Sequence, residues 1–404
     1  MDSLPRRDVL KNLTAIGAGA LSGGMSRAQA NLPAGSSDVI LKENQKPGTR
    51  DWLLTKPRID PSTKYRCPWI EGYCSQSSVE AGETLSFYTS CNPPSPFTID
   101  LYRLGYYDGR GGRFLQRLGP FQGKTQPDPP VGEKRIRVCD WQPCVSLRIP
   151  DSWVSGVYVG KLTAERDGTQ SYVIFIVRDR RDADYIFQCS DNTWQAYNRW
   201  PSQFSLYDNG EHQWYWGGGV RVSYQRPYGK YCQILDAPLT TGSGEFFLWE
   251  YPMAHWMESL GYDVTYVSNL DTHRDGSSLT RAKGFLSVGH DEYWTIAMFN
   301  NVKAAINAGV SVGFFSGNAV CGRIALNEEQ RAFERVGVFG PPGGTREFEQ
   351  MKSLVHQRPY ANELIGAHST GPVTGGADWI CTQADHWIYA DTGMKLADRI
   401  PGLI

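Results

Sequence analysis

The chain has 404 residues, of which 40% are hydrophobic, so it is long enough for two or three domains and apolar enough to bury a core. Its 41 basic and 42 acidic side chains give a net charge of −1, which argues against a nucleic acid or an anionic membrane as partner. Aromatic residues make up 12%, a content that suits either an aromatic core or the wall of a binding cleft.

Residues 1–30 have the features of a twin-arginine export signal. Arg6 and Arg7 precede a short apolar run diluted by Gly and Ala, and Ala28-Gln29-Ala30 offers a small-x-small cleavage site. The run is too short and too rich in Gly to span a bilayer, and no other segment is a candidate span. We therefore expect an exported, periplasmic or extracellular protein without a membrane span.

The next two segments differ in pattern. Residues 31–66 are polar and irregular, which predicts an extended arm. Residues 67–180 contain short alternating stretches separated by turn residues, and 155–179 is typical of two strands around the Arg166-Asp167-Gly168 turn. Short strands at this spacing predict an all-β, immunoglobulin-like sandwich over 67–180.

From residue 181 the pattern changes to alternating strands and helices. Apolar runs predict strands over 184–190, 263–268, 283–289 and 310–317, with helical spacing over 246–262 and 296–309. This order predicts an α/β domain over 181–404, built on a parallel sheet. Ligands of such sheets bind beyond the carboxyl ends of the strands.

The motif "GHDEYW" (289–294) lies at such a strand end. His290, Asp291, Glu292 and Tyr293 follow the strand 283–289 directly, and all four can bind a hard metal or move protons. The alternative is a helix N-terminus, in which Asp291 is the cap and Glu292 favours the positive end of the helix.

Two other stretches should reach the same edge of the sheet. In "SGNAVCG" (316–322) the turn presents Asn318 where a nucleophile elbow would carry Ser or Cys, and Cys321 is displaced and predicted to be structural. A cysteine amidase that uses Cys321 is the alternative. The loop-like stretch 189–219 carries four tryptophans and forms either an aromatic wall over the site or a loop fixed by its aromatics.

Four blocks carry a resemblance to a known family. "NTWQAYN" (192–198), "WEYP" (249–252), "GYDV" (261–264) and "GHDEYW" (289–294) resemble the large (beta) subunit of N,N-dimethylformamidase and its relatives. The resemblance is best over 183–325, and the arm and sandwich look like those of exported relatives. It implies a class I glutamine-amidotransferase-like α/β domain with a flavodoxin-type sheet. It also implies a mononuclear ferric ion, Fe(III), bound by two tyrosines and one glutamate, without a nucleophilic Ser or Cys.

The resemblance also suggests metal ligands. His-x-Glu-Tyr places one ligand on Tyr293, and Tyr251 is the best match for the second tyrosine. Glu363 is our choice for the glutamate, with Glu347 and Glu349 as rivals. A ferric ion prefers anionic oxygen, and its charge lowers the pKa of a bound phenol.

The expected function follows from this set. We expect an iron-dependent hydrolase of a C–N amide bond in a small molecule, with His290 or Glu292 orienting water and Asn318 holding the amide. The sequence is compatible with assembly into a homo-oligomer. The alternative is a non-catalytic exported protein that binds a cell-envelope or extracellular glycan through its aromatic stretch.

Overall fold

The computed structural model describes residues 37–211, 214–329, 331–340, 355–356, 358–366 and 378–401, all within the unit Ser37–Ile404. The predicted signal peptide, Glu347 and Glu349 lie outside the described residues. The predicted arm is not extended throughout, because it contains the helix α2 (Val39–Asn44).

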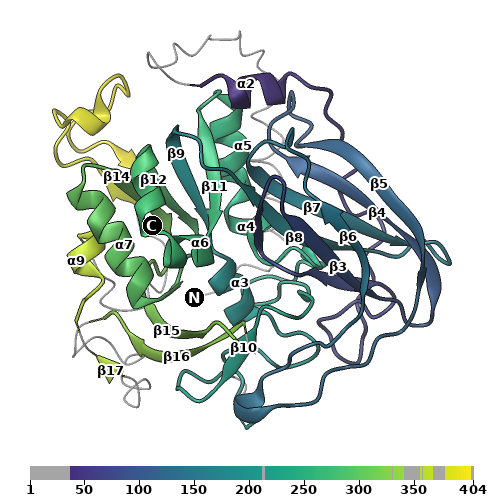
Figure 1. Cartoon of the computed structure of the whole chain (residues 1–404). Coiled ribbons are helices and arrows are strands. Elements are labelled where there is room, and N and C mark those ends of the chain that lie inside the picture. Colours follow the sequence, from purple (N-terminus) through teal and green to yellow (C-terminus); the bar gives the residue numbers. More distant parts are fainter. Residues whose placement is uncertain are drawn as a thin grey trace, which may run out of the picture. The chain divides into compact units, whose positions relative to one another are not determined.

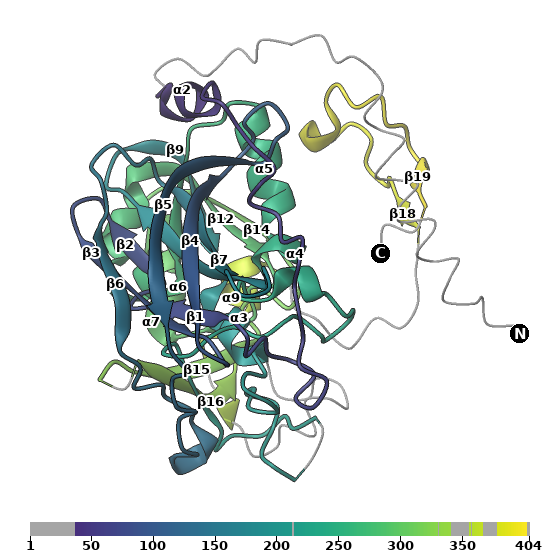
Figure 2. The same cartoon turned by 90° about the vertical axis from the view of Figure 1, so that its right-hand side faces the viewer.

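Two antiparallel-rich sheets occupy the region predicted to be all-β (Figure 1). The larger sheet has the order β2 (Ser78–Glu80), β8 (Gln170–Arg178), β7 (Gly156–Ala164), β4 (Ser95–Leu104), β5 (Gly112–Gly123). The smaller sheet has the order β1 (Glu71–Cys74), β3 (Thr84–Ser90), β6 (Pro143–Arg148). Apolar side chains of both sheets share one buried core, in which Phe87 of β3 contacts Phe175 of β8 edge to face. Figure 2 shows β4, β5 and β7 side by side.

The four strands predicted after residue 181 are present and form one parallel sheet. Its order is β11 (Val264–Ser268), β9 (Ala183–Cys189), β12 (Ala282–Gly289), β14 (Ser311–Ser316). Successive side chains of a strand point to opposite faces of a sheet. Phe285 accordingly packs in one core with α7 (Ile296–Asn307), whereas Leu286 packs in another core with α5 (Tyr251–Ser259). Figure 1 shows these helices on the two sides of the sheet.

The helix predicted over 246–262 is divided into α4 (Phe246–Trp249) and α5. Pro252 is the reason, because it has no N–H group and fits only the first turn of a new helix. The divided helix places Glu250 and Glu245 close to the carboxyl end of β12.

A further sheet, which the sequence did not predict, lies next to this edge. Its order is β10 (Arg221–Ser223), β16 (Ala332–Val338), β15 (Gly322–Asn327), β13 (Tyr293–Trp294), and β17 (Val355–His356) also pairs with β16. The stretch 189–219 is not wholly loop-like, because it begins with α3 (Asp191–Tyr197).

The remaining described elements are short. They are α6 (Asn269–Arg274), α9 (Asn362–Ile365), β18 (Trp379–Ile380) and β19 (Arg399–Ile400), with single 3₁₀ turns at Glu133–Arg135, Pro238–Thr240, Gly276–Arg281 and Trp387–Tyr389. Within the described ranges, no helix combines the length and the hydropathy needed to cross a bilayer.

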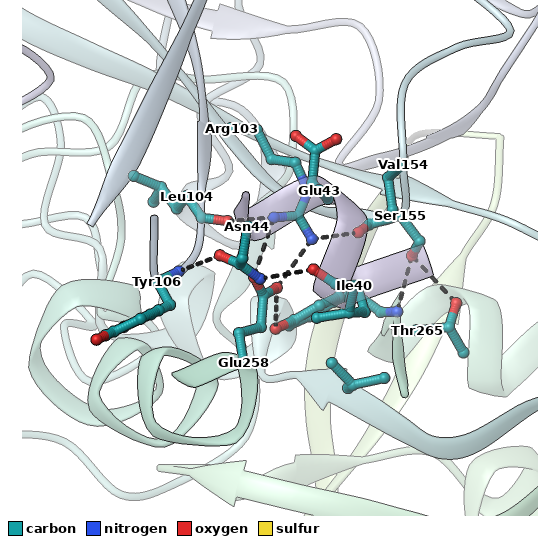
Figure 3. Close-up of polar contacts among 12 residues, drawn as sticks. Ile40, Glu43, Asn44, Arg103, Leu104, Tyr106, Val154, Ser155, Glu258 and Thr265 are labelled. Atoms are coloured by element: carbon teal, nitrogen blue, oxygen red, sulfur yellow. Dashed lines mark hydrogen bonds and ion pairs between the residues drawn. The ribbon is translucent and has the colours of Figure 1, made fainter. Parts of the chain in front are cut away.

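A buried ion pair connects the antiparallel and the parallel regions (Figure 3). The guanidinium of Arg103 on β4 lies 2.8 Å from the carboxylate of Glu258 on α5, and both side chains are fully buried. Arg103 also donates to the backbone oxygen of Ser155 at 2.8 Å, and Asn44 of α2 donates to Glu258 at 2.9 Å. One pair of charges therefore holds α2, β4 and α5 together.

Candidate functional site

The chain leaves the parallel sheet at Gly289, whose φ is +86°. A Cβ atom at this position would lie 2.6 Å from the Glu250 side chain and 3.0 Å from that of Trp249, so only glycine fits. The next residues turn toward α3 and then enter β13. Strand β12 therefore delivers "HDEY" to its carboxyl end, as the sequence predicted.

The four polar residues of this motif do not act alike. Asp291 is buried and accepts hydrogen bonds from Gln188 at 2.6 Å and from Ser287 at 2.7 Å. It does not cap a helix, since the cap of α7 is Thr295, whose hydroxyl accepts from the Met298 N–H. Asp291 is a structural residue that fixes the strand ends.

Two phenols converge on the carboxylate of Glu292. The hydroxyl of Tyr197, the last residue of α3, donates to Glu292 Oε2 at 2.5 Å. The hydroxyl of Tyr207 lies 3.2 Å from each Glu292 oxygen and donates to the Tyr197 hydroxyl at 2.5 Å. Three oxygens from three separate segments thus lie within hydrogen-bond distance of one another.

Burial dominates the electrostatics of this cluster. Burial, followed by the charge of Glu292, raises the pKa of both Tyr197 and Tyr207 well above the ordinary value for a phenol. Burial alone would also raise the pKa of Glu292, but the hydrogen bond and charge of His290 outweigh it and lower that pKa. The phenols are therefore neutral around an ionised carboxylate.

His290 contacts the same oxygen of Glu292 as Tyr197 does, and its ring lies 5.0 Å from that of Tyr197. Its Nδ1 is 3.2 Å from Glu245 Oε2, and its Nε2 is 3.3 Å from Glu292 Oε2. Burial lowers the pKa of the imidazole, but its hydrogen bonds to the two carboxylates prevail and raise the pKa to about 10. The exposed Asn318 Nδ2 is 3.4 Å from His290 Nε2, so the structure brings His290, Glu292 and Asn318 together.

Tyr293 occupies the far side of Tyr207. Its fully buried phenol contacts the hydroxyl of Tyr207 and the guanidinium of Arg335 on β16, and no hydrogen bond links it to Glu292. The centre of the guanidinium is 4.7 Å from the ring centroid of Tyr207 and 5.3 Å from that of Tyr293. Tyr293 is thus at the site, but it is linked to the carboxylate of Glu292 only through Tyr207.

The structure does not bring the other two expected ligands to this cluster. Tyr251 begins α5, and its hydroxyl donates to the backbone oxygen of Gly111 at 3.0 Å, because that face of α5 packs against the antiparallel region. The carboxylate of Glu363 accepts from the Tyr360 N–H at 3.2 Å and lies 3.7 Å from Arg358. Among the described residues, neither side chain contacts Glu292 or Tyr293.

Sequence reasoning missed Tyr197, Tyr207 and Arg335. Tyr197 is part of the "NTWQAYN" block that carried the resemblance, and Tyr207 lies ten residues further on, so both were within reach as tyrosines of the stretch that overhangs the sheet edge. Nothing in the sequence indicated Arg335 as a site residue, because it lies on β16, in a sheet that the sequence did not predict.

The donor set fits a hard cation. Among the described residues no three His, Cys, Asp or Glu side chains cluster as a metal site, so tyrosine oxygens are needed to complete one. The oxygens of Tyr197, Tyr207 and Glu292 are 2.5–3.2 Å apart. Oxygens bound ~2.0 Å from an octahedral ion lie roughly 2.9 Å apart, and two phenolates with a carboxylate are the anionic ligands that such an ion prefers.

A small cavity of about 20 Å³ borders this cluster, because Tyr197 and Glu245 are part of its lining. A larger cavity lies apart from the cluster. A cavity of about 390 Å³ lies between Ser75 and Glu328, and the ring of Tyr224 forms part of its wall. Tyr224 donates to Asn192, which in turn donates to the backbone oxygen of Tyr293 at 2.9 Å. This cavity is therefore separated from the cluster by two side chains.

The comparison with protein families identifies the class of this chain. A family model described as "N,N-dimethylformamidase beta subunit-like, C-terminal" matches residues 98–404, which is more than half of the chain. The chain therefore belongs to the N,N-dimethylformamidase beta subunit-like family, and the resemblance seen in its motifs is confirmed.

The other comparisons add little. The search of curated proteins gave no match. Among solved structures, a superoxide reductase (neelaredoxin) from Ignicoccus hospitalis is similar at 17% identity over 28% of this chain and 79% of that chain. Its TM-score of 0.17 is too low to indicate a shared fold.

Proposed function

We propose that this chain is a metal-dependent hydrolase of a C–N amide bond in a small molecule. The observation that carries the proposal is the convergence of Tyr197, Tyr207 and Glu292 next to His290, at the carboxyl end of the parallel sheet. Family membership supports the reaction class, and the residues fit the ferric ion that the family implies.

The proposed ligands are Tyr197, Tyr207 and Glu292, in place of Tyr251, Tyr293 and Glu363. Tyr197 and Tyr207 both contact the carboxylate, whereas Tyr293 contacts Tyr207 and the guanidinium of Arg335. A guanidinium carries a permanent positive charge, which disfavours a second cation on the oxygen that it contacts.

The fold supports the same reading. The sheet order β11-β9-β12-β14 corresponds to the first four strands of a flavodoxin-type sheet, as the glutamine-amidotransferase-like assignment requires. The turn after β14 carries Asn318 at φ 51° and no nucleophile at its centre. The proposed fold is thus an immunoglobulin-like sandwich followed by an amidotransferase-like domain that has no covalent catalyst.

Once bound, the ion would polarise an amide carbonyl and lower the pKa of a water molecule. The residues of the chain have the remaining tasks. His290, held between two carboxylates and protonated at neutral pH, is placed to give a proton and take it back, and the Asn318 side chain reaches the same space. The ring of Trp214 stacks on Tyr207 at 4.7 Å and shields the cluster from water.

The same stacking weighs against the glycan-binding alternative. Trp214 and Trp216 both pack against Tyr207, with ring centroids 4.7 Å and 5.2 Å from it, so they belong to the wall of the cluster. Export through the signal at residues 1–30 stays a proposal.

Iron content and the visible spectrum test the proposal directly. We expect about one iron per chain in the wild-type protein, with a tyrosinate-to-iron absorption band, and loss of most iron in Tyr197→Phe, Tyr207→Phe and Glu292→Gln. Tyr251→Phe is the matched control and keeps both iron and band. Amine release from a panel of small N-alkyl amides should follow iron content.

Two results would contradict the proposal. One is folded wild-type protein that binds far less than one iron per chain. The other is a Tyr251→Phe variant that loses iron as Tyr207→Phe does.

A further inference from the structure

Tyr293 and Arg335 lie at the site but have no role in the proposed function. Both side chains are buried, with exposed fractions of 0% and 2%. The guanidinium donates to the Tyr293 hydroxyl, and a guanidinium cannot accept a hydrogen bond. The Tyr293 oxygen is therefore the acceptor in this contact, and its own proton is free to point elsewhere.

The only other hydroxyl that Tyr293 contacts among the described residues is that of Tyr207. A phenol has one proton, so Tyr293 donates it to the Tyr207 oxygen. Tyr207 in turn donates to Tyr197 at 2.5 Å, and Tyr197 donates to Glu292 at 2.5 Å. The four contacts form a chain of donors that starts at a cation and ends at a carboxylate.

Arg335 is fixed in this position from three sides. It donates to the backbone oxygen of Trp216 at 2.7 Å, and its guanidinium lies over the rings of Tyr207 and Tyr293. Among the described residues, no carboxylate forms an ion pair with it. Because arginine does not lose its proton in proteins, Arg335 remains the donor at the start of the chain.

We propose that Tyr293 and Arg335 are positioning residues that tune the Tyr207 oxygen as a metal ligand. The inference rests on the proposed function, in which Tyr207 gives up its proton to bind the ion. Tyr293 still donates to that oxygen, and the hydrogen bond becomes charge-assisted. It withdraws electron density from the phenolate, so the bound ion is a stronger Lewis acid than it would be without Tyr293.

The position of the tyrosinate-to-iron absorption band measures this effect. A hydrogen bond to the phenolate lowers the energy of its oxygen electrons, so the transition that moves one of them to iron needs more energy. Removal of the bond therefore shifts the band to longer wavelength. A merely structural role for Tyr293 would leave the wavelength unchanged.

The experiment titrates metal-free protein with Fe(III) and records stoichiometry and band position. We expect Tyr293→Phe, which keeps the ring, to bind one iron with a band at longer wavelength than that of the wild type. Arg335→Gln shifts it in the same direction, because Tyr293 becomes a weaker donor, and Arg335→Lys restores most of the wild-type position. Tyr224→Phe is the matched control: it removes the hydroxyl of a buried tyrosine that is linked to Tyr293 through Asn192, and it leaves the band in place.

The outcomes separate this inference from the proposed function. Full iron binding with an unshifted band in Tyr293→Phe overturns the tuning role and leaves the proposed function intact. Loss of iron in Tyr293→Phe also overturns it, because Tyr293 is then a ligand. Absence of both iron and band in the wild type overturns both proposals. If Arg335→Gln does not fold, Tyr293→Phe and Arg335→Lys still decide the question.

Discussion

Single side chains at the carboxyl edge of the parallel sheet differ in how burial acts on their charge. Glu292 remains ionised because His290 is beside it, whereas Asp191, at the start of α3, has no such cation. Burial raises the pKa of Asp191 to about 7, against the opposing effect of its hydrogen bonds with Ser77 and the Asn269 N–H. Asp191 therefore makes the stability of the protein depend on pH.

The prediction for Asp191→Asn follows from the sign of this shift. Below about pH 4, Asp191 carries a proton in both the folded and the unfolded chain. Between about pH 4 and pH 7 only the folded chain keeps this proton. The free energy of unfolding of the wild type therefore falls by up to ~1.4 kcal/mol for each unit by which the pH rises. Asparagine cannot ionise. Relative to the wild type, Asp191→Asn should gain roughly 2–4 kcal/mol in free energy of unfolding between pH 4 and pH 8.

Urea unfolding of the two proteins at pH 4.5, 6 and 8 measures this difference. A difference that stays constant over the three pH values would show that the buried carboxyl does not hold a proton in the folded state.

At the same scale, the sequence could predict the residues that follow core strands directly. His290, Glu292 and Asn318 each come just after an apolar run, and the structure brings them together. Tyr207 could not be placed in this way, because its position depends on the path of the chain after α3, which no periodic pattern describes. Tyr251 was expected at the site only because of its motif. It lies on the side of α5 that faces the antiparallel region, so its hydroxyl bonds to Gly111 and does not reach the cluster.

At the scale of elements, predictability follows length and apolar pattern. Strands β9, β11 and β12 are short apolar runs buried on both faces, and the edge strand β14 is a short apolar run that is partly exposed, so the apolar pattern alone indicated all four. Strand β10 has three residues and pairs with residues 332–334, more than a hundred positions later. A strand of three residues is too short to show an alternating apolar pattern, and its partner strand is fixed by tertiary structure alone. For these reasons the sequence did not predict this sheet.

The N-cap of α7 gives a prediction at this scale. The Thr295 hydroxyl accepts a hydrogen bond from the Met298 N–H at 3.1 Å, and the helix buries Phe299 and Val302 in the core that includes Phe285. Thr295→Ala leaves that N–H without a partner and should lower the free energy of unfolding by about 1 kcal/mol, whereas Thr295→Ser should keep most of it. Denaturant unfolding checks the values, and equal loss in both variants would contradict the cap.

At the scale of the molecule, the pair of Arg103 and Glu258 is a fully buried polar link between the antiparallel and the parallel regions. Glu258 also accepts from the hydroxyl of Tyr266 on β11 at 3.0 Å, so one carboxylate contacts α2, β4 and β11. Removal of one member leaves the other charge buried without compensation, which is far costlier than loss of a surface pair.

We therefore expect Glu258→Ala to lower the free energy of unfolding by roughly 3–5 kcal/mol. Arg117→Ala is the matched control, because this side chain is 61% exposed in its pair with Asp100, and its loss should cost less than about 1 kcal/mol. The double variant Arg103→Met/Glu258→Leu should recover much of the loss, since it removes both charges. Equal effects of Glu258→Ala and Arg117→Ala in thermal and urea unfolding would disprove the link.

The buried position of Arg103 also limits how such a chain can be cut or recombined. A fragment that starts after β8 would leave Glu258 without its cation and would expose the face of the parallel sheet that carries Val264, Tyr266 and Leu286. We therefore expect that the part with the candidate site does not fold independently of the antiparallel region. A chimera between relatives should inherit β4 and α5 from the same parent, because the two elements share this buried ion pair.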